Sequence, residues 1–508
     1  MAKPEATNKP PSSGKGGSTI KQGATAPRGP IIKTDPPLPA DAKPGQHPTV
    51  EHRVEAGKVA RAEHPRSSHA AWNPAQRQQQ PLDLLAEQAT TRVPELVPIR
   101  YGRMATSPFA YYRGAALPMA ADLATSPHTG LMVQLCGDAH LSNFGAFASP
   151  ERDMVFDIND FDETNPGPFE WDVKRLAASL EVAARGRGFD ADVARTVVIN
   201  GVRAYQEQIR AFAEMSNLQI WYTRLDVASA IERWGGEVSK AAMLRVQKNV
   251  AKAQTKDQLK ARDKLCRLEA GELRFASDPP TLVPVEELFD ADTGQDIEEG
   301  VHDAIRSYRR TLPSDRRHLL ERYRFLDLAR KVVGVGSVGT RAWIALFVGR
   351  DNDDTLILQV KEAEASVLER FVGRSQFNNH GERVVSGQRV MQAASDAFLG
   401  WQRVTVGVDG QPHDYYLRQL WDWKLSADID TMDPEMLGVY AQLCGWTLAR
   451  GHARSGDAVA IGAYLGTGPT FAQALADFAH AYADQNEVDH QALVDAIAAG
   501  TVEAQSGV

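Results

Sequence analysis

The sequence lacks most features of secreted, zinc-binding, membrane-spanning or nucleic-acid-binding proteins. It contains three cysteines in 508 residues, Cys136, Cys266 and Cys444. They are widely spaced and include no C-x-x-C pair, which gives neither a disulfide framework nor a zinc ligand set. No apolar run is long enough to span a bilayer. The net charge of −8 provides no dominant basic surface, which argues against a general nucleic-acid binder.

The two ends of the chain show no pattern of packed structure. The N-terminal stretch MAKPEATNKPPSSGKGG has no apolar segment of the kind found in a secretory signal, so we expect a cytoplasmic protein without membrane contact. Residues 1–66 are rich in Pro, Gly, Ser, Thr and Lys and nearly free of aromatic residues. Such a segment cannot bury enough apolar surface to offset the entropy of ordering. We predict a disordered tail over residues 1–66 and a flexible tail over residues 496–508.

Between these ends the periodicity changes twice. Residues 67–330 contain two strand-like runs, LMVQLCG and DMVFDIND, and several helical patterns such as WDVKRLAASLEVAARGRG. Residues 331–425 contain the strand-like runs RAWIALFVG and TLILQVK and a hairpin with Asp409-Gly410 at its turn. Residues 426–495 are helical in pattern. We predict a helix-rich α+β fold in which residues 331–425 form a small lobe and the flanking parts a large lobe.

The small lobe carries a glycine motif. Gly334, Gly336 and Gly339 spell G-x-G-x-x-G, but a strand follows rather than a helix, which excludes a dinucleotide-binding motif. The order strand, glycine loop, strand, turn, strand is that of the phosphate-covering hairpin of protein kinases, and glycines let the backbone approach phosphate oxygens. The third strand ends in LILQVKEA, which places Lys361 at the position of the phosphate-pairing lysine. A flexible turn and a surface lysine are the alternative interpretation.

The segment GDAHLSNFG contains a second kinase-like pattern. Asp138 and Asn143 have the spacing D-x-x-x-x-N, in which the Asp accepts a hydroxyl proton and the Asn holds Mg²⁺. Downstream, VFDINDFDET supplies Asp157, Asp160 and Asp162, and Asp160 best matches the metal-binding acid. Acids clustered after an apolar strand are costly unless they meet cations. Turn formation and helix capping are the alternative for this set.

Several polar residues allow more than one interpretation. His140 could be a metal ligand or a hydrogen-bonded loop residue. Arg103 and Arg113 could hold a substrate phosphate or pair with the acids, although packing with one ion pair is the commoner use. The partner of Lys361 is left open among three residues, Glu364, Glu369 and Glu382.

A second candidate catalytic acid is Asp457, at the end of the helical stretch PEMLGVYAQLCGWTLARGHARSGD. Gly462 rather than an asparagine follows five residues later, and no D-F pair follows, so we prefer Asp138. His452 and Arg454 at the same helix end could neighbour the site or belong to a solvated basic helix terminus.

These motifs resemble a known pattern. The stretches GDAHLSNFG, FDINDFDET and GPFEWDVKRLAASL resemble the H-G-D-x-x-x-x-N, I-D-F and D-L-A motifs of aminoglycoside and choline phosphotransferases, with Cys136 in place of the usual histidine. Asp138, Asn143, Asp160 and Asp172 match in order. The resemblance implies that Asp172 supports the catalytic loop, and Asp172 also sits where a helix could be capped.

From about Pro65 the whole chain is similar to an uncharacterised bacterial family, the domain of unknown function 2252. The stretches that carry this similarity include VPIRYGRMATSPFAYYRGAA, GVGSVGTR, GQRVMQAASDAFLGW, YYLRQLWDWK and LARGHARSGD. The family resemblance implies no activity.

The order of the motifs is unusual for a kinase. Protein kinases place the glycine loop before the catalytic loop, whereas Asp138 and Asp160 here precede Gly334 and Lys361. We therefore predict a circularly permuted, kinase-like two-lobe fold, because permutation is tolerated where termini lie close together at the surface.

The function expected from these patterns is an ATP- and Mg²⁺-dependent phosphotransferase that binds a nucleotide and an unknown small-molecule or protein acceptor. The predicted catalytic residues are Asp138, Lys361, Asp172 and His140. The predicted nucleotide-binding residues are Gly334, Gly336, Ser337, Gly339, Lys361 and Gln419. The predicted metal ligands are Asn143, Asp160 and Asp157. A metal-dependent phosphoesterase that uses Asp138, His140, Asp157 and Asp160 and a nucleotide-binding pseudokinase remain as alternatives.

Overall fold

The computed structural model describes residues 48–507 apart from 256–257, 290, 333, 408 and 421–422, and gives only the backbone of 258–259 and 291–299. The described chain combines many helices with antiparallel sheets, which confirms the predicted α+β class. Within these residues, no helix is both long enough and apolar enough to cross a membrane.

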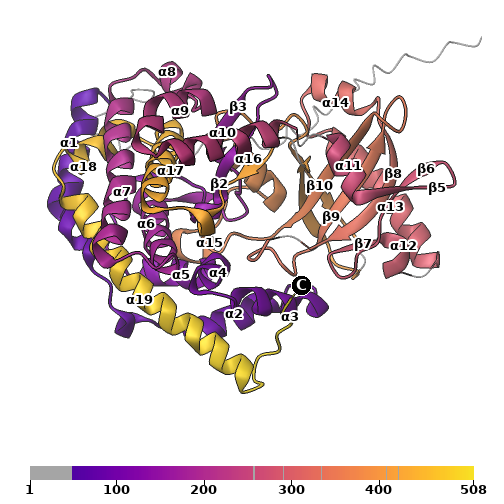
Figure 1. Cartoon of the computed structure of the whole chain (residues 1–508), viewed down its shortest axis with the longest axis horizontal. Coiled ribbons are helices and arrows are strands. Elements are labelled where there is room, and N and C mark those ends of the chain that lie inside the picture. The colour runs from indigo at the N-terminus through magenta and orange to yellow at the C-terminus, as the bar shows by residue number, and fades with distance from the viewer. Residues whose placement is uncertain are drawn as a thin grey trace, which may run out of the picture. The chain divides into compact units, whose positions relative to one another are not determined.

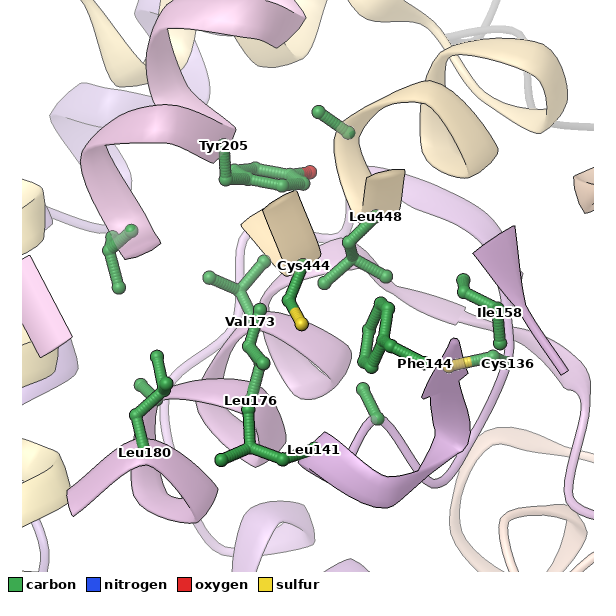
Figure 2. Packing of buried hydrophobic residues seen from close by; sticks show 14 of the residues in the cluster. Cys136, Leu141, Phe144, Ile158, Val173, Leu176, Leu180, Tyr205, Cys444 and Leu448 are labelled. Atoms are coloured by element: carbon green, nitrogen blue, oxygen red, sulfur yellow. The ribbon is translucent and has the colours of Figure 1, made fainter. Parts of the chain in front are cut away.

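The largest hydrophobic core is formed by helices from both halves of the sequence, which lie side by side in Figure 1. These helices are α5 (Ala116–Ala124), α6 (Phe169–Gly186), α7 (Ala191–Ala213), α17 (Pro434–Ser455), α18 (Ala458–Leu465) and α19 (Thr470–Ala498). Helix α6 ends at Gly186 as predicted and is buried on every side over residues 169–184. Figure 2 shows Val173 and Leu176 of α6 close to Cys444 of α17 in this core. A helix enclosed in this way gives a rigid base for the loops at its ends.

Helix α1 (Val50–Glu63) corrects the prediction of a disordered tail to residue 66, whereas residues 1–47 lie outside the described chain. The side chain of Thr49 caps the helix. A Cβ atom at Gly57 would collide with the carbonyl oxygen of Ala460, so α1 and α18 are in backbone contact. Arg61 donates from Nε to the carbonyl oxygen of Tyr464 at 2.7 Å. Small residues and arginine-to-carbonyl bonds make this contact, so no apolar stripe revealed it in the sequence.

The C-terminal segment also packs. Helix α19 extends to Ala498, and the backbone N–H of Gln505 donates to the carbonyl oxygen of Pro98 at 2.8 Å. Val502 and Ala504 pack against the cluster that contains Tyr101. The prediction of a flexible tail over residues 496–508 is therefore wrong for residues 496–505, because the tail covers α3 (Val97–Met104).

Two small sheets contribute buried residues to the same core, among them Leu135, Phe144 and Ile158. Strand β1 (Met132–Leu135) pairs with β4 (Asn165–Pro168). Strand β2 (Phe144–Ala148) lies between β3 (Met154–Ile158) and β13 (Leu425–Ser426). The runs LMVQLCG and DMVFDIND are thus strands, as predicted, and their ends present the loops that contain Asp138 and Asp160.

A larger sheet has the strand order β11-β12-β10-β9-β8-β7. Its strands are β7 (Leu282–Pro284), β8 (Arg324–Lys331), β9 (Ala342–Val348), β10 (Thr355–Ala363), β11 (Gly400–Val404) and β12 (His413–Gln419). Alternate residues of β9 belong to different hydrophobic clusters, Ile344 and Leu346 to one and Ala345 and Phe347 to the other. Apolar residues on both faces explain why RAWIALFVG is an unbroken apolar run.

The sheet that contains β9 and β10 begins before residue 331, where we predicted this segment to start, since β7 and β8 belong to the same sheet. Both strands were missed because β7 lies in a proline-rich stretch and β8, RFLDLARK, mixes charged and apolar residues. The predicted hairpin around Asp409-Gly410 is confirmed as β11 and β12.

The remaining elements flank these units. The helices are α2 (Pro81–Ala89), α4 (Pro108–Gly114), α8 (Asn217–Tyr222), α9 (Val227–Trp234), α10 (Lys240–Gln254), α11 (Gln258–Leu265), α12 (Val285–Leu288), α13 (Ala291–Arg309), α14 (Ser314–Leu320), α15 (Glu369–Val372) and α16 (His380–Met391). A hairpin is formed by β5 (Cys266–Glu269) and β6 (Glu272–Phe275).

Candidate active site

The loop after β1 is held by a buried acid from α6. Asp172 accepts hydrogen bonds from the backbone N–H groups of Cys136 and Gly137 at 2.8 and 3.0 Å. The cap residue of α6 is Pro168, so Asp172 does not cap this helix. Gly137 has φ +86, and a Cβ atom there would collide with the carbonyl oxygen of Glu163. The loop therefore requires glycine at 137 and takes its shape from α6.

A histidine and a tyrosine support Asp172 from behind. His452 of α17 places Nε2 3.2 Å from Asp172 Oδ2, and its Nδ1 lies 2.9 Å from the hydroxyl of Tyr205. His452 is fully buried, so it lies behind the loop rather than in the site. Arg454 stacks on Trp221 at 3.8 Å. The predicted second acid, Asp457, caps α18 through bonds to the N–H groups of Val459 and Ala460.

Asp138 faces an open cavity with its carboxylate anchored. Arg175 donates from Nε to Asp138 Oδ1 at 2.8 Å. Burial raises the pKa of Asp138 to about 6 and outweighs the opposing effect of the Arg175 charge. Asn143 donates from Nδ2 to the backbone carbonyl oxygen of Asp138 at 2.9 Å, which closes the loop. That bond leaves the Oδ1 of Asn143 for another partner.

His140 lies beside Asp138 in a buried position. Its Nε2 is 3.7 Å from Asp138 Oδ2, and its Nδ1 is buried without a hydrogen-bond partner among the described residues. Burial and the positive charges of Arg113 and Arg175 hold the pKa of His140 well below its usual range. The imidazole is therefore neutral at neutral pH.

The acids of VFDINDFDET separate into two environments. Asp157 is 1% exposed and lies 2.6 Å from the Nη2 of Arg450, and its Oδ2 accepts from the N–H of Ala393 at 2.9 Å. It does not line the cavity, so the prediction of Asp157 as a metal ligand is wrong. Its partners come from α17 and from the end of α16, elements far from Asp157 in sequence. Asp160 and Asp162 line the cavity.

Lys361 of β10 joins these two acids. Its Nζ lies 2.6 Å from Asp162 Oδ2 and 3.5 Å from Asp160 Oδ2. The hydroxyl of Tyr416, which is opposite Lys361 in the register of β10 and β12, donates to Asp162 Oδ1 at 2.6 Å. Burial opposes the charged form of Lys361, but the two carboxylates raise its pKa. Burial also raises the pKa of Asp160, but the charges of Lys361 and Arg418 outweigh this effect and lower the pKa to about 2.

The glutamates considered as partners of Lys361 have other places. Glu364 lines the cavity. Glu369 accepts from the N–H of Ser366 at 3.2 Å and lies 3.7 Å from Arg383. Glu382 lies in the first turn of α16. Among the described residues, the acids that Lys361 contacts are Asp160 and Asp162, so the expected glutamate partner is replaced by the acids of the preceding loop. Asp162 was absent from the predicted site, although it stands next to Asp160 in the motif.

The glycine loop between β8 and β9 covers the same acids. Gly334 and Gly339 have positive φ angles of +68 and +92. Ser337 donates from Oγ to Asp162 Oδ2 at 3.4 Å. A Cβ atom at Gly336 would lie 3.2 Å from the carbonyl oxygen of Arg113, so the loop runs close to α4. A side chain at this position would press on that backbone.

One cavity of about 520 Å³ brings most of these residues together. The predicted residues in its wall are Asp138, His140, Asn143, Asp160, Gly334, Gly336 and Ser337. Gly339 instead lies against the side chain of Arg92. Gln419 lies at the end of β12, where its N–H donates to Asp396 at 2.9 Å, and it is not part of the wall. Lys361 reaches the cavity through its contacts with the two acids.

The sequence model of a family described as "Uncharacterized protein conserved in bacteria (DUF2252)" matches residues 92–496. The chain belongs to this family. Neither a curated protein nor a solved structure matches the chain. The residues of the cavity wall from Arg92 to Val367 all fall inside the region that matches DUF2252.

The wall of this DUF2252 cavity also contains three arginines, Arg92, Arg100 and Arg113. The sequence identified Arg113 as a candidate phosphate-binding residue. It gave no signal for Arg92 and Arg100, because each stands among apolar and small residues. No group of three or more His, Cys, Asp or Glu side chains in the described chain is arranged to hold a metal ion by itself. Asn143 and Asp160 are the oxygen donors of the predicted metal site that do reach the cavity.

Proposed function

We propose that the protein is an ATP- and Mg²⁺-dependent phosphotransferase with a kinase-like site. The observation that carries this proposal is the contact of Lys361 with Asp160 and Asp162, acids that precede it by 201 and 199 residues. The same cavity contains Asp138, Asn143 and the glycine loop. A lysine, a metal-binding acid, a D-x-x-x-x-N loop and a glycine loop are the parts that kinases assemble around a nucleotide triphosphate.

The donors in the cavity fit the nucleotide and its metal. Lys361 and the backbone of the glycine loop would contact phosphate oxygens. Asn143 and Asp160 would hold Mg²⁺, which usually takes one or two carboxylates from the protein and its other ligands from water and phosphate. A site with two protein donors therefore suits Mg²⁺, although the part of the chain that the structure describes contains no three-acid cluster. When bound, Mg²⁺ supplies positive charge that neutralises the phosphates.

Asp138 is suited to receive the proton of the acceptor hydroxyl. Its pKa of about 6 keeps it ionised at neutral pH, and Arg175 fixes its direction. In the proposed reaction the acceptor oxygen forms a bond to the γ-phosphorus, the bond from that phosphorus to the bridging oxygen breaks, and ADP leaves. The hydroxyl proton passes to Asp138. Asp172, supported by His452, acts as a positioning residue for this loop.

The order of elements supports a circularly permuted kinase-like fold as part of the proposal. From β8 to α17 the chain supplies a glycine loop, a lysine strand, a helix, a hairpin and a long helix. This is the order in which a kinase small lobe leads into its large lobe, whereas the loops with Asp138 and Asp160 come earlier. Chemistry requires that the parts meet in space, and the contact between Lys361 and Asp162 meets that condition.

The phosphoesterase alternative has less support, because one of its four residues, Asp157, is closed off by Arg450. A pseudokinase would keep the binding groups without turnover.

A thermal-shift titration tests the proposal. We expect Mg²⁺ and ATP together to raise the Tm more than either alone, because a ligand that binds only the folded state stabilises it. Consumption of ATP at a rate that requires Asp138 would separate an enzyme from a pseudokinase. No shift with Mg²⁺ and ATP together would contradict the proposed function, and hydrolysis of phosphate esters without ATP would favour the phosphoesterase.

A further inference from the structure

The arginines of the cavity lack the partners that buried charges usually have. Arg100 of α3 is 1% exposed and Arg92 is 9% exposed. Nε of Arg92, Nε and Nη1 of Arg100 and Nε of Arg113 are buried without a hydrogen-bond partner among the described residues. No described carboxylate lies within 4.0 Å of the three guanidinium groups. Buried charges are normally paired, because an unpaired one costs several kcal/mol of desolvation (about 3–5 kcal/mol when a partner is removed).

Their surroundings hold these arginines at the cavity wall. Arg100 donates from Nη2 to the carbonyl oxygen of Gly114 at 3.0 Å and to Gln88 Oε1 at 3.1 Å. Arg92 donates from Nη1 to the carbonyl oxygen of Val338 in the glycine loop. The guanidinium groups of Arg92 and Arg100 are thus tied by neutral acceptors on one side, whereas Nε of both and Nη1 of Arg100 are buried without an acceptor among the described residues.

The three positive charges influence one another and the catalytic loop. Burial, and then the charge of Arg92, lowers the pKa of Arg100. Burial lowers the pKa of Arg113, and the negative charge of Asp138 opposes this effect. Arginine stays protonated in proteins. The arginines therefore form a cationic part of the cavity wall between the glycine loop and the neighbourhood of Asp138, and on the side of Arg92 it borders the carboxylates of Glu163 and Glu364.

We propose that Arg92, Arg100 and Arg113 form a phosphate-binding subsite, and that the phosphoryl acceptor is a small molecule that already carries a phosphate ester. This inference rests on the proposed function only for the assignment of the phosphate to an acceptor. A phosphate monoester carries about −1.5 to −2 charges and three acceptor oxygens, which suits three guanidinium groups better than a carboxylate does. A cavity of about 520 Å³ is of the size that encloses small molecules, roughly 300–1,000 Å³.

The test is a thermal-shift titration with inorganic phosphate, Mg²⁺ with ATP, and both together, at constant ionic strength. It compares the wild type with Arg100→Gln, Arg92→Gln, Arg113→Gln and Lys361→Met. Arg350→Gln is the matched control, because the Arg350 side chain is 81% exposed on the turn between β9 and β10. We expect phosphate to stabilise the wild type, the Lys361 variant and the control, and to bind each cavity arginine variant about 10- to 100-fold more weakly, since a charged hydrogen bond is lost.

Two further readouts separate a binding role from a structural one. We expect the ligand-free Tm of Arg100→Gln to equal or exceed that of the wild type, because an unpaired buried charge is removed. A lower ligand-free Tm with an unchanged phosphate shift identifies a structural arginine and overturns the proposal. We also expect the shifts from phosphate and from Mg²⁺ with ATP to add in the wild type.

Other outcomes overturn the proposal in distinct ways. Absence of a phosphate shift in the wild type removes the subsite, whatever Mg²⁺ and ATP do. Mutual exclusion of phosphate and ATP assigns the arginines to the nucleotide, and stronger stabilisation by acetate than by phosphate assigns them to a carboxylate. If phosphate behaves as expected and Mg²⁺ with ATP gives no shift, the subsite stands and its assignment to a phosphoryl acceptor falls with the proposed function.

Discussion

Two groups of acids in one short segment differ in what surrounds them. The Asp157 side chain is 1% exposed and is closed by Arg450, whose side chain is also 1% exposed. The side chains of Asp160 and Asp162 are 26% and 29% exposed at the cavity wall and share one lysine. A buried acid with its own arginine maintains the fold, whereas acids that share a cation beside a cavity can exchange it for a ligand. The same residue type therefore serves stability at one position and binding a few residues later.

The largest expected effect is on ATP turnover, which depends on the acids at the cavity wall. Asp138→Ala removes the group that accepts the hydroxyl proton, so we expect ATP turnover to fall by about 10²- to 10⁴-fold. Steady-state rates measured with Mg²⁺ and ATP check this expectation, and a cooperative thermal unfolding transition above the assay temperature shows that the variant is folded. Normal turnover in the variant would remove Asp138 from the mechanism.

The buried pair of Asp157 and Arg450 is expected to affect the stability of the fold. Arg450→Met leaves Asp157 buried without its cation, so we expect a loss of about 3–5 kcal/mol in the free energy of unfolding. Urea denaturation measures this loss. Arg195→Met is the matched control, because Arg195 and Asp477 form an exposed ion pair and such pairs contribute about 0–1 kcal/mol. Equal effects of the two substitutions would show that the Asp157 pair is not structural.

Lys361→Met tests whether the shared lysine serves binding. We expect the affinity for Mg²⁺ with ATP to fall by about 10- to 100-fold, since a charged contact to phosphate is lost. Isothermal titration measures it, with Lys361→Arg as the variant that keeps the charge. Unchanged affinity in Lys361→Met would place the lysine with Arg450 as a structural cation.

The two sides of the cavity should also differ in their response to pH. The pKa of Asp138 is about 6 and that of Asp160 about 2, so of these two acids Asp138 alone takes up a proton between pH 7 and pH 5. A protonated Asp138 cannot accept the hydroxyl proton, and turnover should fall by about tenfold over this range. Because its pKa is raised in the folded state, Asp138 contributes stability at low pH that is lost as the pH rises through about 6. A turnover that is flat from pH 5 to pH 7 would contradict this assignment.

The smallest effect is expected at Glu382. This residue was a candidate partner of Lys361, but it lies in the first turn of α16, and Lys361 contacts Asp160 and Asp162 instead. Glu382→Gln should change neither the affinity for Mg²⁺ with ATP nor the free energy of unfolding by more than about 0.5 kcal/mol. A large loss of nucleotide affinity would restore Glu382 to the site.

Local patterns predicted much of this protein. The apolar runs that became β9 and β10, the hairpin at Asp409-Gly410 and the end of α6 at Gly186 follow from neighbours in sequence. The spacing of Asp138 and Asn143 identified them as candidate site residues, and both line the cavity. Helix α1 escaped prediction because its contacts with α18 are made by small residues and arginine donors, which leave no apolar periodicity.

The sequence by itself determined many of the helices, strands and glycine turns, among them β9, β10 and the end of α6, because these depend on residues a few positions apart. Only the tertiary structure decided which charges meet. Arg450 lies 293 residues from Asp157, and Lys361 lies 199 residues from Asp162. Whether an acid is closed by an arginine or left at a cavity wall depends on how α6, α17 and β10 pack, and Coulomb interactions in a buried site depend on distance in space rather than along the chain.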